Sequence, residues 1–174
     1  LEIPEMARHY VRDSIRQGEG RQVEFEVKGL LRDMPFDQPG TGRFYIKAPV
    51  SHVVYDFAPA TLVDTGTAPA WPMLTDLSGT LVFEGASMQV QQASTGFAGH
   101  QGLRMETVSA HIPDLQHPRL TVKAAGHPDL GAALQFVRHS PLTALTEHAL
   151  DAAQAKGSVQ LAFDLELPIE QLEH

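Results

Sequence analysis

The sequence predicts an α+β protein that is mostly β: a long, curved, groove-like antiparallel sheet in meander order, with an N-terminal helix and a helical pair before the last strand. Three observations predict this fold. Apolar and polar residues alternate over most of the chain, which is typical of strands with one covered face. Gly and Pro interrupt the alternation at short intervals, which favours hairpin connections. Helical spacing of apolar residues occurs near the N-terminus and again between residues 129 and 155.

The composition narrows the possible functions. The chain has 174 residues, of which 43% are hydrophobic, so a single domain over residues 1–171 can bury a core of ordinary size. The formal net charge of −8 provides no long-range attraction to nucleic acid or to an anionic membrane surface. The absence of cysteine excludes disulfides, thiolate metal sites and cysteine nucleophiles. Because of the negative net charge, we expect no nucleic-acid partner.

The two ends of the chain indicate a fragment. The sequence starts abruptly at Leu1 without a signal peptide, and residues 172–174 resemble the start of a vector-encoded histidine tag. No run approaches the roughly 18 apolar residues of a membrane span. We expect an excised piece of a larger protein whose anchor or signal lies elsewhere, and we exclude residues 172–174 from the fold.

The first expected element is a helix over residues 4–17. Pro4 suits a first helical turn, and Gly18 suits a C-terminal stop. The apolar residues that recur at helical spacing are Ile3, Met6, Ala7, Tyr10, Val11 and Ile15. Such a stripe could cover part of the sheet.

Two strands with period-two alternation follow. The second of them continues beyond Pro49, and a proline at that place suggests a bulge or a sheet edge because it has no backbone N–H to donate. The alternating apolar residues are Val23, Phe25 and Val27 in the first strand, and Phe44, Ile46, Ala48, Val53, Tyr55 and Phe57 in the second.

A loop and a series of short strands come next. Residues 69–72 hold the only tryptophan, Trp71, between two prolines and predict the loop. Residues 79–85 then begin a hairpin. The apolar residues of these strands are Leu81 and Phe83; Met88 and Val90; Leu103, Met105 and Thr107 with its methyl group; and Leu120, Val122 and Ala124. Their spacing predicts an antiparallel meander.

The helical pair and the closing strand end the chain. Asp129 is a plausible N-cap for the first helix, Pro141 a first-turn residue for the second, and Gly157 a C-terminal stop. The two helical stripes are Leu130, Ala133, Leu134 and Val137, then Leu142, Leu145, Ala149 and Ala152. Residues 159–167 then alternate again, with one apolar and one mostly polar face.

Signatures of catalysis and metal binding are weak. Glu147 and His148 lack the second histidine of a zinc-protease helix, and Ser87 lacks the second glycine of a nucleophile elbow. Residues 96–102 are rich in glycine but open no helix, and residues 126–131 lack the lysine of a phosphate-binding loop. We therefore expect no enzyme activity, no cofactor and no metal.

Short motifs in a fixed order carry a family resemblance over nearly the whole chain. They are residues 4–18 and 42–44, Trp71-Pro72, residues 77–85 (LSGTLVFEG), residues 112–115 (IPDL), residues 118–122 (PRLTV), residues 136–142 (FVRHSPL) and the block from Gly157 to Ile169. Each motif is short, so the resemblance rests on their order and spacing. Together they resemble the YhdP-type branch of the AsmA-like bacterial envelope proteins.

The resemblance implies a place and a role. Members of this family are very large proteins of Gram-negative bacteria, anchored in the inner membrane by an N-terminal helix and otherwise periplasmic. They are similar to bridge-like lipid transfer proteins, in which successive strands curl into a groove with an apolar inner wall, and they are implicated in moving phospholipid toward the outer membrane and in its permeability barrier. The implied partners are phospholipid acyl chains and adjacent segments of the parent protein, with membrane contact only through the parent's anchor. The family offers no catalytic residues.

The candidates for an apolar lipid-binding wall are the strand residues expected to point inward. They are Val23, Phe25, Val27, Phe44, Ile46, Leu81, Phe83, Val159, Leu161, Phe163 and Leu165. For each of them the alternative is ordinary core, because the helices at residues 4–17 and 129–155 could cover the whole sheet.

Three functions remain open at this point. The first is a lipid-conduit segment. The second is a structural or protein-interaction module of the cell envelope without its own ligand, which would dock partners on a strand edge. The third, ranked last, is a hydrolase acting on envelope lipid or glycan.

Overall fold

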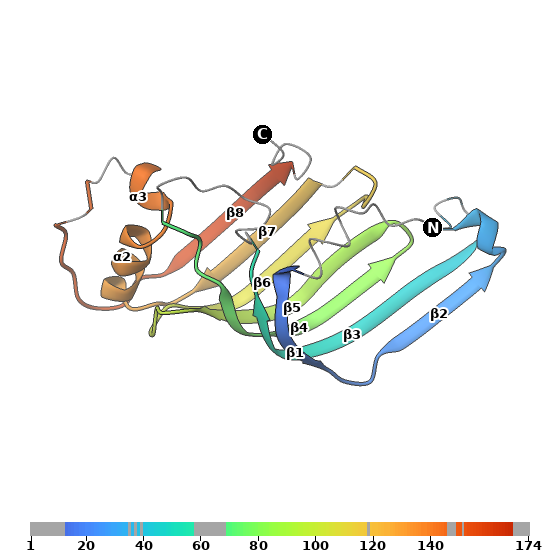
Figure 1. The fold of residues 1–174 in the computed structure, drawn as a ribbon, viewed down its shortest axis with the longest axis horizontal. Coiled ribbons are helices and arrows are strands. Elements are labelled where there is room, and N and C mark those ends of the chain that lie inside the picture. Colours follow the sequence, from blue (N-terminus) through green and yellow to red (C-terminus); the bar gives the residue numbers. More distant parts are fainter. Residues whose placement is uncertain are drawn as a thin grey trace.

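Eight strands form one open sheet in the computed structural model (Figure 1). The structure describes residues 13–34, 36, 38, 40–57, 69–117, 119–145, 149–150 and 152–168. In chain order the elements are β1 (Ile15–Gly20), β2 (Glu24–Gly29), the 3-10 turn η1 (Leu31–Asp33), β3 (Gly42–Tyr55), β4 (Leu74–Glu84), β5 (Ser87–Phe97), β6 (Arg104–Ile112), β7 (Arg119–Gly126), α2 (Leu130–Arg138), α3 (Leu142–Leu145) and β8 (Leu161–Pro168).

The strands from β3 to β8 pair antiparallel in sequence order, which confirms the predicted meander and the mostly β fold class. At the other edge, β1 and β2 share β3 as their partner. Pro49 lies where these two pairings meet, since the residues of β3 that pair with β2 end at Lys47 and those that pair with β1 begin at Val50. The proline therefore occupies an interruption on that side of β3, as its missing N–H requires.

The predicted helix at residues 4–17 is wrong at its C-terminal end. Residues 15–20 form strand β1, in which Ile15 pairs with Tyr55, whereas residues 1–12 lie outside the described part. Gly18, expected to stop a helix, instead lies against β3: a Cβ built there would be 2.8 Å from Cγ2 of Val53. Pairing with the free edge of β3 outweighs the helical spacing of the local sequence.

The helical pair is shorter than predicted and lies at one end of the sheet (Figure 1). Asp129 caps α2 as expected, since its side chain accepts a hydrogen bond from the Ala132 N–H at 3.0 Å. The second helix is described only to Leu145, and residues 149, 150 and 152 form turns; residues 146–148 and 151 are not described. The Arg138 guanidinium donates to the carbonyls of Leu150 and Ala153. These side-chain hydrogen bonds hold Leu150 and Ala153 close to α2.

The best-buried part of the described structure lies toward the α2 end of β5 and β6. Met105 is 1% exposed, and Ala93 and Leu103 are also buried. The rings of Phe97 and Phe136 meet edge to face, 4.9 Å apart, and join β5 to α2. The described helices therefore cover one end of the sheet and do not extend along its strands (Figure 1).

Three non-glycine residues in neighbouring strands have a left-handed backbone: His52 (φ 53), Asp76 (φ 48) and Gln92 (φ 51). Each accompanies a shift in strand register and marks a β-bulge. Backbone strain of this kind is relieved by glycine.

Gln92→Gly is expected to stabilise the protein by about 0.5–1 kcal/mol, because glycine adopts a positive φ without a steric penalty. The matched control is Gln91→Gly in the same strand, where φ is not positive and glycine should destabilise by a similar amount. Urea unfolding of both variants checks this. Equal losses at the two positions would contradict a left-handed bulge at Gln92.

His100 gives the fold a dependence on pH. Its ring is 7% exposed, stacks edge-on to Phe136 at 5.3 Å, and leaves Nδ1 without a hydrogen-bond partner in the described structure. Burial, and then the nearby charge of His139, lower the pKa of His100. The folded state thus prefers the neutral ring, so its stability is complete above the ordinary histidine range and falls as the pH drops through about 6.5, where the unfolded chain takes up the proton first.

His100→Phe is expected to keep the stacked ring and to reduce the loss of stability between pH 7 and pH 5. The melting temperature across this range, followed by circular dichroism, measures the effect. His111→Phe, on the exposed part of β6, is the control and should leave the pH dependence unchanged. If the His100→Phe variant loses as much stability on acidification as the wild type, another group is responsible.

Candidate functional site

Strand register places the apolar candidates from β2 to β5 on one face of the sheet. Phe25 lies opposite Ile46, Ile46 opposite Phe83, and Phe83 opposite Met88. Directly opposed residues of paired strands point to the same side. In the adjacent rows Val27 opposes Phe44, and Leu81 opposes both Ala48 and Val90.

The same face continues to the other edge of the sheet. Val90 opposes Ala110, Ala110 opposes Val122, and Val122 opposes Leu165. One row further on, Ala124 opposes Phe163. We call this side the apolar face, and it carries nine of the candidates: Phe25, Val27, Phe44, Ile46, Leu81, Phe83, Leu161, Phe163 and Leu165.

Two candidates lie outside the strands. β2 begins at Glu24, so Val23 precedes it, and β8 begins at Leu161, so Val159 precedes it. The Val159 N–H donates to the carbonyl of Pro128 at 3.1 Å, beside the start of α2. The sequence predicted strand positions for Val23 and Val159 because the alternation of apolar and polar residues begins before the first paired residue of each strand.

Sequence reasoning missed several members of the apolar face. Met88, Val90 and Val122 had been assigned to strands but not to the wall. Val108 and Ala110 in β6 belong to it as well, while Thr107, expected in register with Met105, lies opposite Ala125 on the other face. A bulge between Met105 and Val108 shifts the alternation by one residue, and the local sequence does not mark it.

Phe36 adds an aromatic ring at the end of β2 and β3. It is buried, and a Cβ at Gly29 would lie 2.8 Å from its Cε1. Gly29 opposes Gly42, so two adjacent glycines leave the room that this ring fills. The signal in the sequence is this glycine pair, which only strand pairing brings together.

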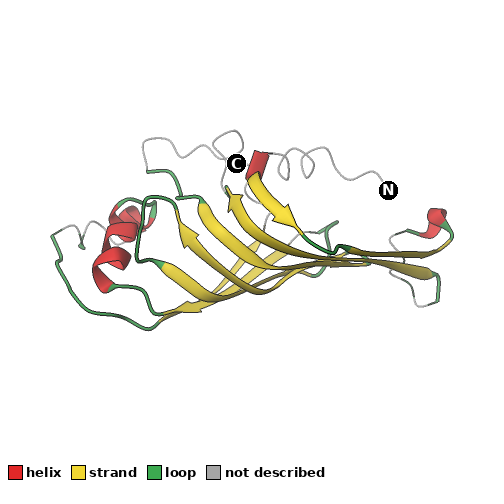
Figure 2. Ribbon diagram, turned by 90° about the horizontal axis from the view of Figure 1, so that it is seen from below, coloured by secondary structure: helices red, strands yellow, loops and turns green. Residues whose placement is uncertain are grey.

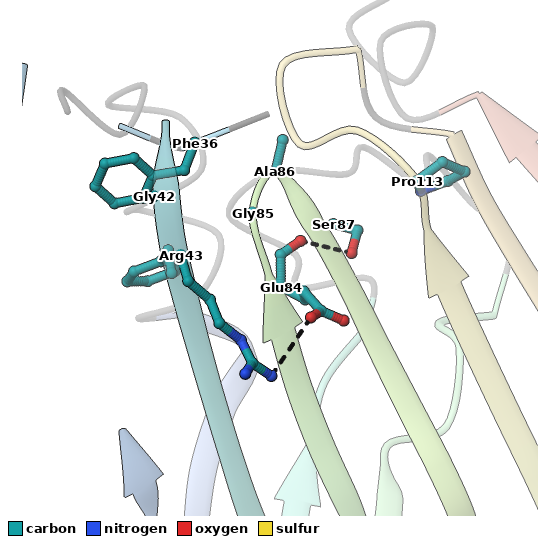
Figure 3. Close-up of a pocket in the computed structure, with 9 residues that line it drawn as sticks. Phe36, Gly42, Arg43, Glu84, Gly85, Ala86, Ser87 and Pro113 are labelled. Carbon is teal, nitrogen blue, oxygen red and sulfur yellow. Dashed lines mark hydrogen bonds and ion pairs between the residues drawn. The ribbon is translucent and has the colours of Figure 1, made fainter. Parts of the chain in front are cut away.

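A cavity of about 390 Å³ opens at the same end of the sheet, near Phe36 and Pro113 (Figure 3). Arg43 is the one cation among the described lining residues, and it lies 3.7 Å from the Glu84 carboxylate and 3.2 Å from that of Glu26. The Ser87 hydroxyl donates to the Glu84 carbonyl at 2.8 Å. Among the described residues that line this cavity, no nucleophile is paired with a base, and the positive charge of Arg43 is neutralised by the two carboxylates.

The exposure of the apolar face is greatest at the two edges. Phe25 in β2 is 66% exposed, and Phe163 and Leu165 in β8 are 41% and 42% exposed. Leu81 and Phe83 in β4 are half-buried, and Ile112 in β6 is buried. Large apolar side chains therefore remain accessible on both sides of a more covered centre.

The opposite side, which we call the polar face, carries ion pairs between neighbouring strands. Their partners are Glu24 and Lys47, Glu26 and Arg43, Arg43 and Glu84, Lys123 and Asp164, and Arg119 and Glu166. A hydrogen bond from Lys28, aided by the Arg43 charge, holds the pKa of Glu26 below its usual range. Val82, opposite Lys47 and Gln89, is buried on this face, but the ion pairs make the two sides of the sheet differ in polarity.

The described residues contain no group of three potential metal ligands. Three histidines each lie beside a single carboxylate on separate parts of the surface: His52 near Asp76, His117 near Asp114 and His127 near Glu106. Within the described part, no helix is long and apolar enough to cross a membrane.

Comparison with known proteins identifies a family. The family model described as YhdP protein matches residues 2–174. No curated protein and no solved structure matches the chain. The matched range includes every strand and helix described above.

Proposed function

Because this chain belongs to the YhdP family over residues 2–174, we propose that it is a periplasmic segment of a bridge-like protein that binds or conducts phospholipid between the inner and outer membranes. The parent protein would be anchored in the inner membrane of a Gram-negative bacterium. The proposed ligands are phospholipid acyl chains, held on the apolar face, and the proposed segment performs no catalysis.

One observation carries this proposal: a single apolar face runs across seven strands, from Phe25 in β2 to Leu165 in β8, and is backed by a charged one. An acyl chain gains roughly 0.8 kcal/mol for each methylene that leaves water. Such a ligand needs apolar area and no directional polar group. The exposed rings of Phe25 and Phe163 offer that area at both edges of the sheet.

The alternative is a structural or protein-interaction module of the envelope. The observation in its favour is the exposure of the two edges, where β8 has a described neighbour on one side only. An edge strand with free backbone groups can pair with another strand, for example from an adjacent segment of the parent protein. In this case the exposed Phe163 and Leu165 would be covered by protein.

Native mass spectrometry of the purified protein distinguishes the lipid-binding proposal from the interaction module. The lipid proposal expects phospholipid to remain bound after gentle purification, and a Leu165→Glu variant to carry less of it. Ala162→Glu, in the same strand but on the polar face opposite Ala125, is the control and should retain the lipid. Protein free of phospholipid under all gentle conditions would favour the interaction module.

A further inference from the structure

Four neighbouring strands each contain one extra residue at the same level of the sheet. Between Val50 and Val53, β3 spans three residues where β4 spans two, from Gly79 to Leu77. Along the ladder between β4 and β5, β4 has an extra residue at Asp76 and β5 has an extra residue at Gln92. In β6 the excess lies between Met105 and Val108, opposite Thr95 and Ala93.

The extra residues all lie on the polar face. Gln91 and Gln92 are both exposed, while Val90 and Ala93 on either side of them belong to the apolar face. An extra residue lengthens the side of the sheet on which it lies and bends the strand. With four bulges in line, the polar face is the longer, outer side and the apolar face is the inner side. Seen along its edge in Figure 2, the sheet is curved.

Polar side chains join these four strands along the line of bulges. His52 Nδ1 in β3 is 2.9 Å from the Asp76 carboxylate in β4. Arg104 in β6 reaches over β5 and donates to Asp76 at 3.2 Å and to the Ser94 hydroxyl in β5 at 3.1 Å. We call His52, Asp76, Ser94 and Arg104 the clamp.

The clamp differs from the other ion pairs of the polar face. His52 and Asp76 are themselves left-handed bulge residues, so the side chains that form the clamp belong to the backbone positions that bend the sheet. Hydrogen bonds from His52 and from Arg104 hold the pKa of Asp76 below its usual range, so its carboxylate stays ionised. The pair of Lys123 and Asp164, by contrast, joins two strands in regular register.

We propose that the line of bulges and the clamp form a fixed crease that sets how far the apolar face is closed. Opening the sheet would move β3 and β6 relative to each other and would stretch the bonds of Asp76 to both strands. The crease is a property of the folded protein and does not depend on whether the apolar face binds lipid.

The distance between the two edges of the sheet tests this directly. The protein has no cysteine, so spin labels at Glu24→Cys in β2 and Ala162→Cys in β8 report one distance distribution by pulsed electron paramagnetic resonance. Asp76→Lys places a positive charge beside His52 and Arg104, and it is expected to lengthen the mean distance by several ångströms and to broaden the distribution. Reversing the pair, with Asp76→Lys and Arg104→Asp together, should recover much of the original distribution.

The matched control is Asp164→Lys, which breaks the pair with Lys123 away from the bulges and should leave the distribution unchanged apart from the label's immediate surroundings. Should Asp76→Lys fail to fold, Arg104→Gln is to be measured in the same way. A distribution unchanged in the folded clamp variant, or changed equally by the control, would overturn the proposal. All samples are measured without added lipid, so the result is independent of the proposed function.

Discussion

Leu81→Asp is expected to reduce phospholipid binding at least tenfold. Leu81 lies in the middle of the sheet, directly between Ala48 and Val90 on the apolar face. An acyl chain that covered this position would bury an unpaired carboxylate, and removing such a charge from water costs several kcal/mol. Lipid that remains bound to the purified variant, counted by native mass spectrometry, gives the result.

Thr80→Asp is the matched control for this substitution. Thr80 precedes Leu81 in β4, lies opposite Pro49 and Gln91, and belongs to the polar face. The same charge placed there should leave lipid binding within about twofold of the wild type. Because Leu81 is half-buried, both variants must first give the circular dichroism spectrum of a folded protein, and Phe163→Asp at the exposed edge serves as a second substitution. Equal effects on the two faces would argue against the apolar face as the binding surface.

Met105→Ala is expected to have the largest effect on stability, about 2–5 kcal/mol, because it removes a fully buried side chain and leaves a cavity. Met105 lies in β6 opposite Thr95, which is itself buried. Met73→Ala is the control, since Met73 is exposed and its truncation should cost less than about 1 kcal/mol. Unfolding in urea measures both.

A loss below about 1 kcal/mol in Met105→Ala would show that the core does not lie where β5 and β6 approach α2. A similar loss in the two variants would lead to the same conclusion. The unfolding slope should stay constant between variants, so that the shift in midpoint reports stability alone.

The alternation of polarity was sufficient to predict most of the sheet. Phe25, Ile46 and Phe83 were assigned to three separate strands, and the structure places them in one row. This prediction succeeds because a half-covered antiparallel sheet imposes a period of two on each strand, whichever strands become neighbours.

The features that escaped prediction depend on contacts between distant parts of the chain. The bulges at His52, Asp76 and Gln92 contain no glycine, so the local sequence does not indicate a left-handed backbone. Strand β1 was taken for the end of a helix because its pairing with β3, 30 or more residues away, is invisible in a local pattern. Phe36 joins the site only because strand pairing brings two glycines together beneath its ring.

Contact between the apolar face and lipid in living cells is the central claim, and site-specific photocrosslinking tests it most directly. A photoreactive amino acid is placed at Phe25 and Phe163 on the apolar face, and at Glu24 and Ala162, their neighbours in the same strands, on the polar face. The proposed function predicts phospholipid adducts at the first two positions and few or none at the other two. No adduct at Phe25 and Phe163, or equal adducts on both faces, would contradict it.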